Sequence, residues 1–134
     1  YEMLRSLVGS EMCIRDRPIR DDWRLEDRDD QGKFMPFSLP HEMPDAFVCN
    51  CDAVAYNLVE TLKRNGYRVP QDVAVTGYDD YRYSTLCSPQ LTSYRVDLDG
   101  MAKTAVAQLR KMAHKPAIAP TVIVPGGFVR REST

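Results

Sequence analysis

The sequence predicts an α/β fold built on a parallel sheet. Two short apolar runs, Ala46–Cys49 and Val73–Gly77, have the length and composition of buried strands, and a segment with helical periodicity connects them. Strand, helix and strand within about thirty-five residues form a βαβ unit, which requires parallel strands and a right-handed crossover. The length of 134 residues suits one domain, or part of a larger one.

The composition excludes several classes of protein. The formal net charge is −1 and the sequence pI is about 6.1, so the chain lacks the excess of Lys and Arg that neutralises nucleic-acid phosphates. No run reaches the ~18 apolar residues that a membrane helix needs, which predicts a soluble protein with no membrane partner. Four cysteines in a chain of this length are too few for a disulfide scaffold.

The first seventeen residues are expected to lie outside the fold. The ten residues from Leu7 to Asp16 match one reading frame of a transposase adapter used in sequencing libraries. A secretion signal does not fit, because Glu2 stands where positive charge is required and Gly9 interrupts the apolar run. We therefore expect residues 1–17 to be an adapter-derived artefact and residues 18–134 to form the domain.

The segment that follows is charged and then rich in proline. We expect a short strand near Trp23–Glu26 and a loop after it. The prolines at positions 36, 40 and 44 forbid a helix over Lys33–Pro44 and favour extended chain.

The first clear helix is expected between the two buried strands. Asn50 and Asp52 are both good residues to cap its N-terminus, and Gly66 is the expected stop at its other end. Its apolar residues recur at helical spacing, at Ala55, Leu58, Val59 and Leu62.

The C-terminal third predicts a further strand, helix and strand. Leu91–Val96 is strand-like, and Asp97 caps a helix that Pro116 and Pro120 end. That helix carries an apolar stripe formed by Leu98, Met101, Ala102, Ala105, Leu109 and Met112. Thr121–Val124 is predicted to be a strand, and Gly126 and Gly127 turn the chain into Phe128–Arg131.

Candidate binding residues follow the two buried strands. Ligands of an open parallel sheet bind beyond the carboxyl ends of its strands, where Asn50 and Asp52 follow one strand and Asp79 and Asp80 the other. An ionised Asp offers two acceptor oxygens, which suit a pair of vicinal sugar hydroxyls. A purely structural role is equally compatible with the pattern: Asp52 as a helix cap, and Asp79 and Asp80 as turn residues.

Catalytic and metal sites have no support in the sequence. Cys49 and Cys51 point to the same face of a strand, which predicts buried small hydrophobes, and no second Cys or His pair completes a zinc site. The pattern also lacks a nucleophile motif, a phosphate loop and a dinucleotide fingerprint. We expect no catalytic residue, no metal and no cofactor, and thiols that stay reduced in the cytoplasm.

Four motifs together resemble a known family. They are Pro44–Ala55, Gly66–Asp80, Ser88–Ser93 and Val129–Thr134, and in this order and spacing they are similar to the C-terminal part of LacI/GalR transcriptional regulators. The resemblance implies a truncated parallel-sheet lobe of a periplasmic-binding-protein-like (type I) sensor domain. It also implies that the helix after Asp97 packs on a first lobe that is largely missing from this sequence.

The resemblance implies a function and partners as well. Family members bind a small molecule, commonly a sugar, between two lobes, and this shifts the affinity of a separate N-terminal helix-turn-helix for operator DNA. The expectation is thus the effector-binding part of a cytoplasmic repressor whose full-length parent is a homodimer. It would reach operator DNA only through an N-terminal domain that this chain lacks.

The resemblance also implies site residues. Asp79 matches the family's effector-binding carboxylate, and Asp52 matches the Asp that opens the following helix. Cys51 stands where the family often has Asn, which points either to Asn50 as the contact or to a different effector chemistry. Arg28 lies near the position of a pocket aromatic. The aromatic that would stack on a sugar is left open among Trp23, Tyr81 and Tyr83.

Two other functions are weighed against this one. A transport-type periplasmic sugar-binding protein would share the fold, but unpaired cysteines and the Arg-Glu-Ser-Thr ending favour the regulator. An enzyme is disfavoured because no nucleophile and base are paired in the sequence.

Overall fold

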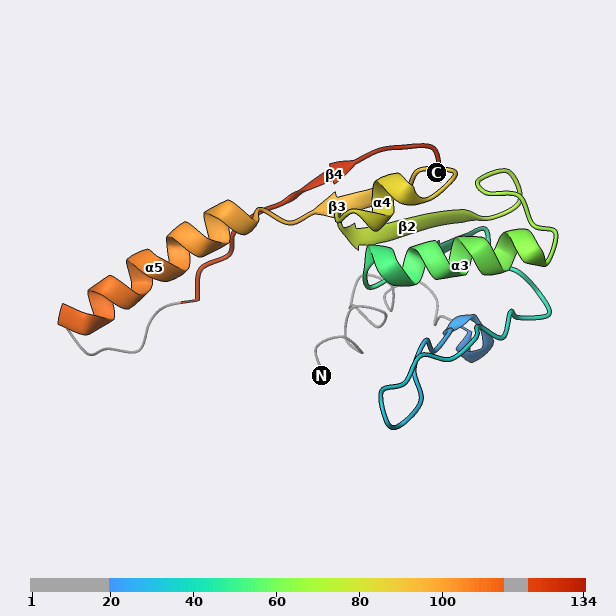
Figure 1. The fold of residues 1–134 in the computed structure, drawn as a ribbon, viewed down its shortest axis with the longest axis horizontal. Coiled ribbons are helices and arrows are strands. Elements are labelled where there is room, and N and C mark those ends of the chain that lie inside the picture. The colour runs from blue at the N-terminus through green and yellow to red at the C-terminus, as the bar shows by residue number, and fades with distance from the viewer. Residues whose placement is uncertain (1–19, 115–120) are drawn as a thin grey trace.

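The sheet is open and mostly parallel. The computed structural model describes residues 20–114 and 121–134 (Figure 1), and in them four strands lie in the order β1-β2-β3-β4. The strands are β1 (Ala46–Val48), β2 (Ala74–Asp79), β3 (Thr92–Arg95) and β4 (Gly127–Val129). The first three are parallel and β4 is antiparallel to β3. The predicted α/β class and the parallel pairing across the first βαβ unit are confirmed.

Helix α3 (Asp52–Arg64) covers one face of the sheet and holds most of the core. Its predicted stripe is buried, with Ala55, Val59 and Leu62 at 0% exposure. These side chains meet Phe47, Val73, Val75 and Leu91 from the sheet and its loops. Gly66 follows the helix with φ +86°, a left-handed conformation that favours glycine, so the predicted stop is confirmed.

The N-terminal segment departs from the prediction. The strand expected near Trp23–Glu26 is absent, and a short 3₁₀-helix, η1 (Asp21–Trp23), stands at its start. The Trp23 indole N–H donates to the carbonyl of Glu42 at 2.8 Å, which holds this segment against the proline-rich stretch instead of the sheet. An isolated bridge between Arg28 and Phe34 closes the loop after it.

The C-terminal part is predicted in outline. Helix α5 (Leu98–His114) forms as expected, with the Gly100 N–H donating to Asp97 Oδ1 at 2.9 Å as a cap. A short helix, α4 (Tyr83–Leu86), was not anticipated. The strand predicted at Thr121–Val124 is wrong, because residues 121–126 have no regular structure and pairing with β3 begins only at Gly127.

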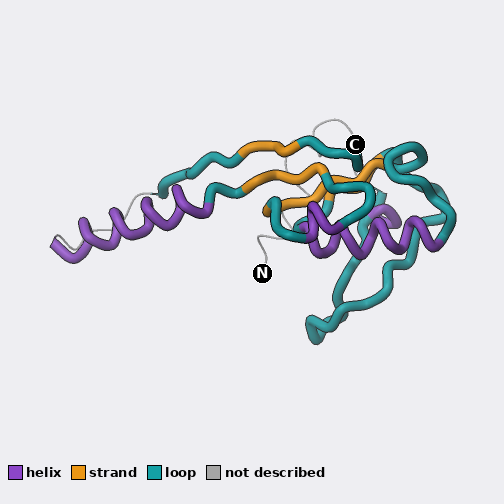
Figure 2. Tube along the Cα trace, turned by 45° about the horizontal axis from the view of Figure 1, so that its top comes forward, coloured by secondary structure: helices purple, strands orange, loops and turns teal. Residues whose placement is uncertain are grey.

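The C-terminus returns to the sheet while α5 extends away from it (Figures 1 and 2). Ser133 accepts from the Val75 N–H at 2.9 Å and its hydroxyl donates to the Val75 carbonyl at 2.6 Å. This return places Arg131 beside the carboxyl end of β2. The predicted adapter segment, residues 1–17, lies outside the described residues.

Candidate functional site

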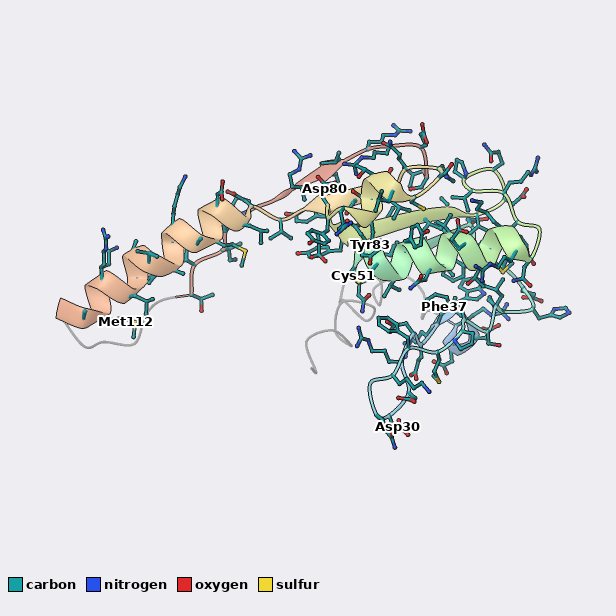
Figure 3. The ribbon with its side chains drawn as sticks, viewed as in Figure 1. Asp30, Phe37, Cys51, Asp80, Tyr83 and Met112 are labelled. Atoms are coloured by element: carbon teal, nitrogen blue, oxygen red, sulfur yellow. The ribbon has the colours of Figure 1, made fainter. Side chains whose placement is uncertain are left out.

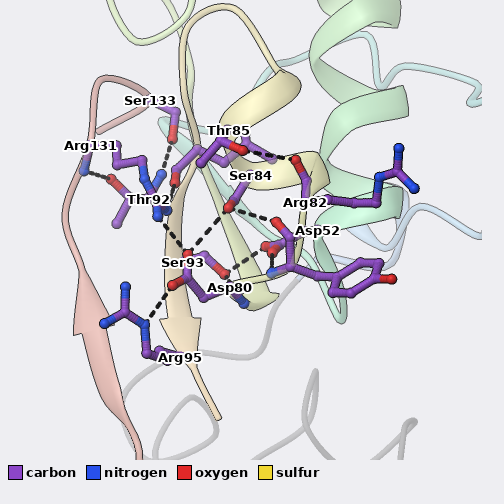
Figure 4. A network of polar contacts seen from close by, with 12 residues as sticks. Asp52, Asp80, Arg82, Ser84, Thr85, Thr92, Ser93, Arg95, Arg131 and Ser133 are labelled. Carbon is purple, nitrogen blue, oxygen red and sulfur yellow. Dashed lines mark hydrogen bonds and ion pairs between the residues drawn. The ribbon is translucent and has the colours of Figure 1, made fainter.

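The carboxyl edge of the sheet is built around Asp52. Its side chain is buried at 1% exposure at the first turn of α3. Oδ1 accepts from the Ser93 hydroxyl and Oδ2 from the Tyr81 N–H, both at 2.6 Å (Figure 4). Burial raises the pKa of this carboxyl, and the two hydrogen bonds act against that rise. Asp52 therefore joins α3 to the loop after β2 and to β3, and it does not cap its own helix.

Gly77 makes room for this carboxylate. A Cβ atom at position 77 would stand 2.1 Å from Asp52 Oδ1, which is far closer than atoms approach in proteins. Since any side chain would displace the carboxylate, the β2 strand requires glycine at this point.

Asp80 is held by two arginines. Its Oδ1 accepts from Arg131 Nη2 and its Oδ2 from Arg95 Nε, both at 2.6 Å, and the Ser84 hydroxyl donates to Oδ1 at 3.2 Å. The Asp80 side chain is 6% exposed and that of Arg131 14%. Burial works against ionisation here, but the hydrogen bonds from the arginines outweigh it and lower the pKa of Asp80.

Asp79 is left free by the same arrangement. It ends β2 with φ +98°, and Asp80 follows at φ +52°, so two consecutive residues adopt the left-handed region. The Asp79 side chain makes no hydrogen bond or ion pair to any other residue within 20–114 and 121–134. Partial burial raises the pKa of its carboxyl, and the nearby charge of Asp52 raises it further.

An open hollow of about 560 Å³ lies in front of Asp79. It is bounded by the ends of β2 and β3, the start of α5 and the chain returning into β4. Its lining includes Tyr81, Arg95, Asp97 and Phe128. Phe128 is 73% exposed and packs edge-on against Tyr94, with ring centres 5.3 Å apart.

Phe128, Arg95 and Asp97 line the hollow but are not among the site residues that the sequence predicts. No local pattern marks them, because pairing between strands brings them to the hollow: β2 with β3 sets Arg95 opposite Asp79, and β4 with β3 brings in Phe128. Of the three aromatics left open, Tyr81 lines the hollow. Trp23 is bound to Glu42, and Tyr83 packs against Tyr56 with ring centres 5.7 Å apart.

Asn50 precedes Asp52 by two residues and does not line the hollow. Its Oδ1 is the one buried side-chain N or O atom within the described residues that lacks a hydrogen-bond partner. A buried acceptor without a donor costs about 1–3 kcal/mol.

The structure does not bring Arg28 to this edge. Its guanidinium lies 4.3 Å from the centre of the Phe34 ring and pairs with Asp27 at 3.5 Å. Asp27 and Phe34 belong to a different hollow of about 280 Å³ against α3. The neighbouring Asp30 stands at the tip of that loop, well apart from Asp80 (Figure 3). Arg28 lies in a loop closed by its bridge to Phe34, so its side chain stays with that loop and away from the sheet edge.

The cysteines of the described region are free. Cys49 and Cys87 are buried, and burial raises their thiol pKa to about 12 and about 11. No group of three or more His, Cys, Asp or Glu side chains within the described ranges is arranged to hold a metal ion. Across the same ranges, every helix is too short or too polar to span a bilayer.

Comparisons with known proteins agree with this geometry. The family model described as a periplasmic binding protein-like domain matches residues 7–134. The transcriptional repressor PurR of Yersinia pestis (strain Pestoides F) is 30% identical over 126 residues, which cover 87% of this chain and 36% of the repressor. The chain thus spans about a third of the length of the curated relatives it matches.

Solved structures show the same likeness. A Lac repressor dimer bound to operator and an anti-inducer matches with a TM-score of 0.63 and 28% identity, over 68% of this chain and 32% of the repressor chain. The regulator CelR in complex with cellobiose matches at 0.62 and 27%, over 67% and 28%. A LacI family regulator from Arthrobacter sp. FB24 in complex with lactose matches at 0.62 and 30%, over 70% and 36%.

Proposed function

We propose that this chain, which belongs to the family of periplasmic binding protein-like domains in the form found in LacI/GalR-type regulators, is the effector-binding part of a repressor. The effector that we propose is a sugar. The observation that carries the proposal is Asp79, a carboxylate free of described partners, facing a hollow that also exposes aromatic rings. Carboxylates that accept from hydroxyls, beside an apolar ring face, are the groups that a sugar requires.

The site residues take different roles in this proposal. Asp79 accepts from ligand hydroxyls directly, and Phe128 and Tyr81 offer ring faces beside it. Asp52 positions the loop that carries Asp79, because both of its oxygens already have partners. Asn50 takes no direct role, because its buried Oδ1 does not line the hollow. Arg28 takes no role.

The likeness to named complexes supports the class of ligand. Cellobiose and lactose are bound by the neighbours CelR and the Arthrobacter regulator, and both are neutral disaccharides. The net charge of −1 gives this chain no counterion-release contribution to DNA binding. We therefore assign operator contact to another part of a complete cytoplasmic, homodimeric protein, and we propose no catalysis.

The test is a calorimetric titration of a complete regulator carrying this sequence with a panel of neutral mono- and disaccharides, including cellobiose and lactose. For any sugar that binds, Asp79→Asn should lower affinity roughly tenfold or more, since charge-assisted hydrogen bonds contribute about 1.5–3 kcal/mol each. By linkage, the variant should stay on operator DNA at sugar levels that release the parent.

Asp30→Asn is the matched control, because it removes one carboxylate charge from the loop tip far from the hollow. Its affinity should equal that of the parent. A parent that binds no sugar of the panel would overturn the class of ligand. An Asp79→Asn variant that binds as tightly as the parent would overturn the site.

A further inference from the structure

Three aromatic side chains form a row across the sheet. The strand register sets Tyr78 of β2 opposite Tyr94 of β3, and Tyr94 opposite Phe128 of β4. These three strands lie side by side in the sheet (Figure 1). Gly77 faces Asp52 of α3, so the next residue along β2, Tyr78, points to the other face of the sheet. The aromatic row therefore lies on the face away from α3.

Tyr94 is the central member of the row and contacts both of its neighbours. Its ring stacks on that of Tyr78 with centres 5.3 Å apart and 13° between the ring planes. It meets the ring of Phe128 edge to face, at 5.3 Å and 83°. Both are arrangements that aromatic rings favour. Since 73% of the surface of Phe128 is exposed, few neighbours can fix its ring, and Tyr94 supplies this contact.

The hydroxyl of Tyr94 also holds the chain that leads to Phe128. It accepts from the Gly126 N–H at 2.9 Å, across thirty-two residues of sequence. A Cβ atom at position 126 would stand 2.6 Å from the Tyr94 ring and would also collide with the Arg95 carbonyl, so glycine permits this close approach. Tyr94 thus contacts both the ring of Phe128 and the backbone two residues before it.

We propose that Tyr94 is a positioning residue of the sugar site and acts by holding Phe128 beside Asp79. Gly126 and Phe128 line the hollow, whereas Tyr94 stands behind them, so its effect on a ligand passes through these two residues. The inference rests on the proposed function, in which the Phe128 ring offers a face to the sugar. Ordering a mobile side chain on binding costs free energy, so a ring that is already held in place binds more tightly.

The first experiment is a calorimetric titration of the complete regulator with cellobiose and with lactose. Tyr94→Leu removes both ring contacts and should weaken the binding of a sugar about threefold to tenfold, the scale of one aromatic pair. Tyr94→Phe keeps the rings and loses only the hydrogen bond from Gly126, so it should retain most of the affinity. Tyr56→Leu is the matched control, because it breaks the ring contact with Tyr83 away from the hollow and should bind as the parent does.

A double variant separates positioning from general destabilisation. Because Tyr94 acts through Phe128, Tyr94→Leu should cost no further affinity in a chain that already carries Phe128→Leu. An equal loss of affinity in both backgrounds would overturn the proposal, and so would a Tyr94→Leu variant that binds as tightly as the parent. Either result would leave the proposed function standing, since the parent still binds the sugar.

A measurement without sugar tests the position of the ring directly. Labelling the 134-residue chain with fluorophenylalanine gives the Phe128 ring a fluorine resonance, which is identified by its loss in Phe128→Leu. Tyr94→Leu should move this resonance toward that of free fluorophenylalanine, whereas Tyr56→Leu should leave it in place. A parent that binds neither sugar would overturn the proposed function. A Phe128 resonance that Tyr94→Leu does not move would overturn the positioning role, whatever the parent binds.

Discussion

Asp79 and Asp80 are neighbours in sequence but have different roles. Asp80→Asn should lower the stability of the fold, whereas Asp79→Asn should weaken ligand binding and leave the stability unchanged. Both residues have positive φ, which asparagine tolerates, so neither substitution strains the backbone. Asp80→Asn leaves the guanidinium of Arg131, 14% exposed, without its ionic partner. Removing one partner of a buried ion pair costs about 3–5 kcal/mol, and the partial exposure of Arg131 favours the lower end. The pair with Arg95, which is 62% exposed, adds at most ~1 kcal/mol.

A loss of about 3 kcal/mol should lower the midpoint of thermal unfolding by about 12 °C in a chain of this size. Asp79→Asn, which breaks no described contact, should shift the midpoint by no more than ~2 °C. The assay is thermal unfolding followed by circular dichroism at pH 7, with both variants and the parent measured together. Equal destabilisation by the two substitutions would refute the division of roles between them.

The pH dependence gives an independent check. The pKa of Asp80 is lower in the folded chain than its usual value near ~3.9, so its ionised form stabilises the fold. That contribution is fully present above the unfolded-state pKa and is lost as the pH falls through the folded-state pKa. The stability difference between parent and Asp80→Asn should hold from pH 7 to 5 and shrink below about pH 4. A difference that does not change down to about pH 2 would contradict the ion-pair explanation.

Two further predictions concern the close approach of Gly77 to Asp52 and the contribution of residues 1–17 to stability. Gly77→Ala should lower the unfolding free energy, measured in urea, by about 1–3 kcal/mol, because its Cβ would stand 2.1 Å from the buried Asp52 carboxylate. Gly127→Ala is the control: no atom lies within 4 Å of its Cβ, so it should be neutral or stabilising. A neutral Gly77→Ala would argue against the buried position of Asp52. Deleting residues 1–17 should leave the unfolding free energy within ~1 kcal/mol of the parent, and a larger loss would contradict their origin in an adapter.

Much of the fold could be predicted because its signals are local. The apolar runs before Asn50 and before Tyr78, and the helical stripe between them, each lie within one element, so periodicity alone identifies them. The wrongly predicted strands lie where contacts with distant parts of the chain decide the structure. Thr121–Val124 has the composition of a strand but no partner there, whereas Gly127–Val129 pairs with β3 through the Tyr94–Phe128 contact. Trp23 was expected in a strand and is held instead by a carbonyl nineteen residues away.

The candidate site shows why sequence locates an edge more easily than it assigns its residues. Polar side chains after two parallel strands predict the carboxyl edge, and Asp52, Asp79 and Asp80 all lie there. Their roles depend on partners far along the chain, since Arg131 is fifty-one residues from Asp80 and Ser93 is forty-one from Asp52. Asp52 and Asp80 are bound by those partners, so the carboxylate left free for a ligand is Asp79. The residue types of Asp79 and Asp80 are the same, so they do not show which of the two binds a ligand. The ion pair that the returning chain forms between Arg131 and Asp80 makes that distinction.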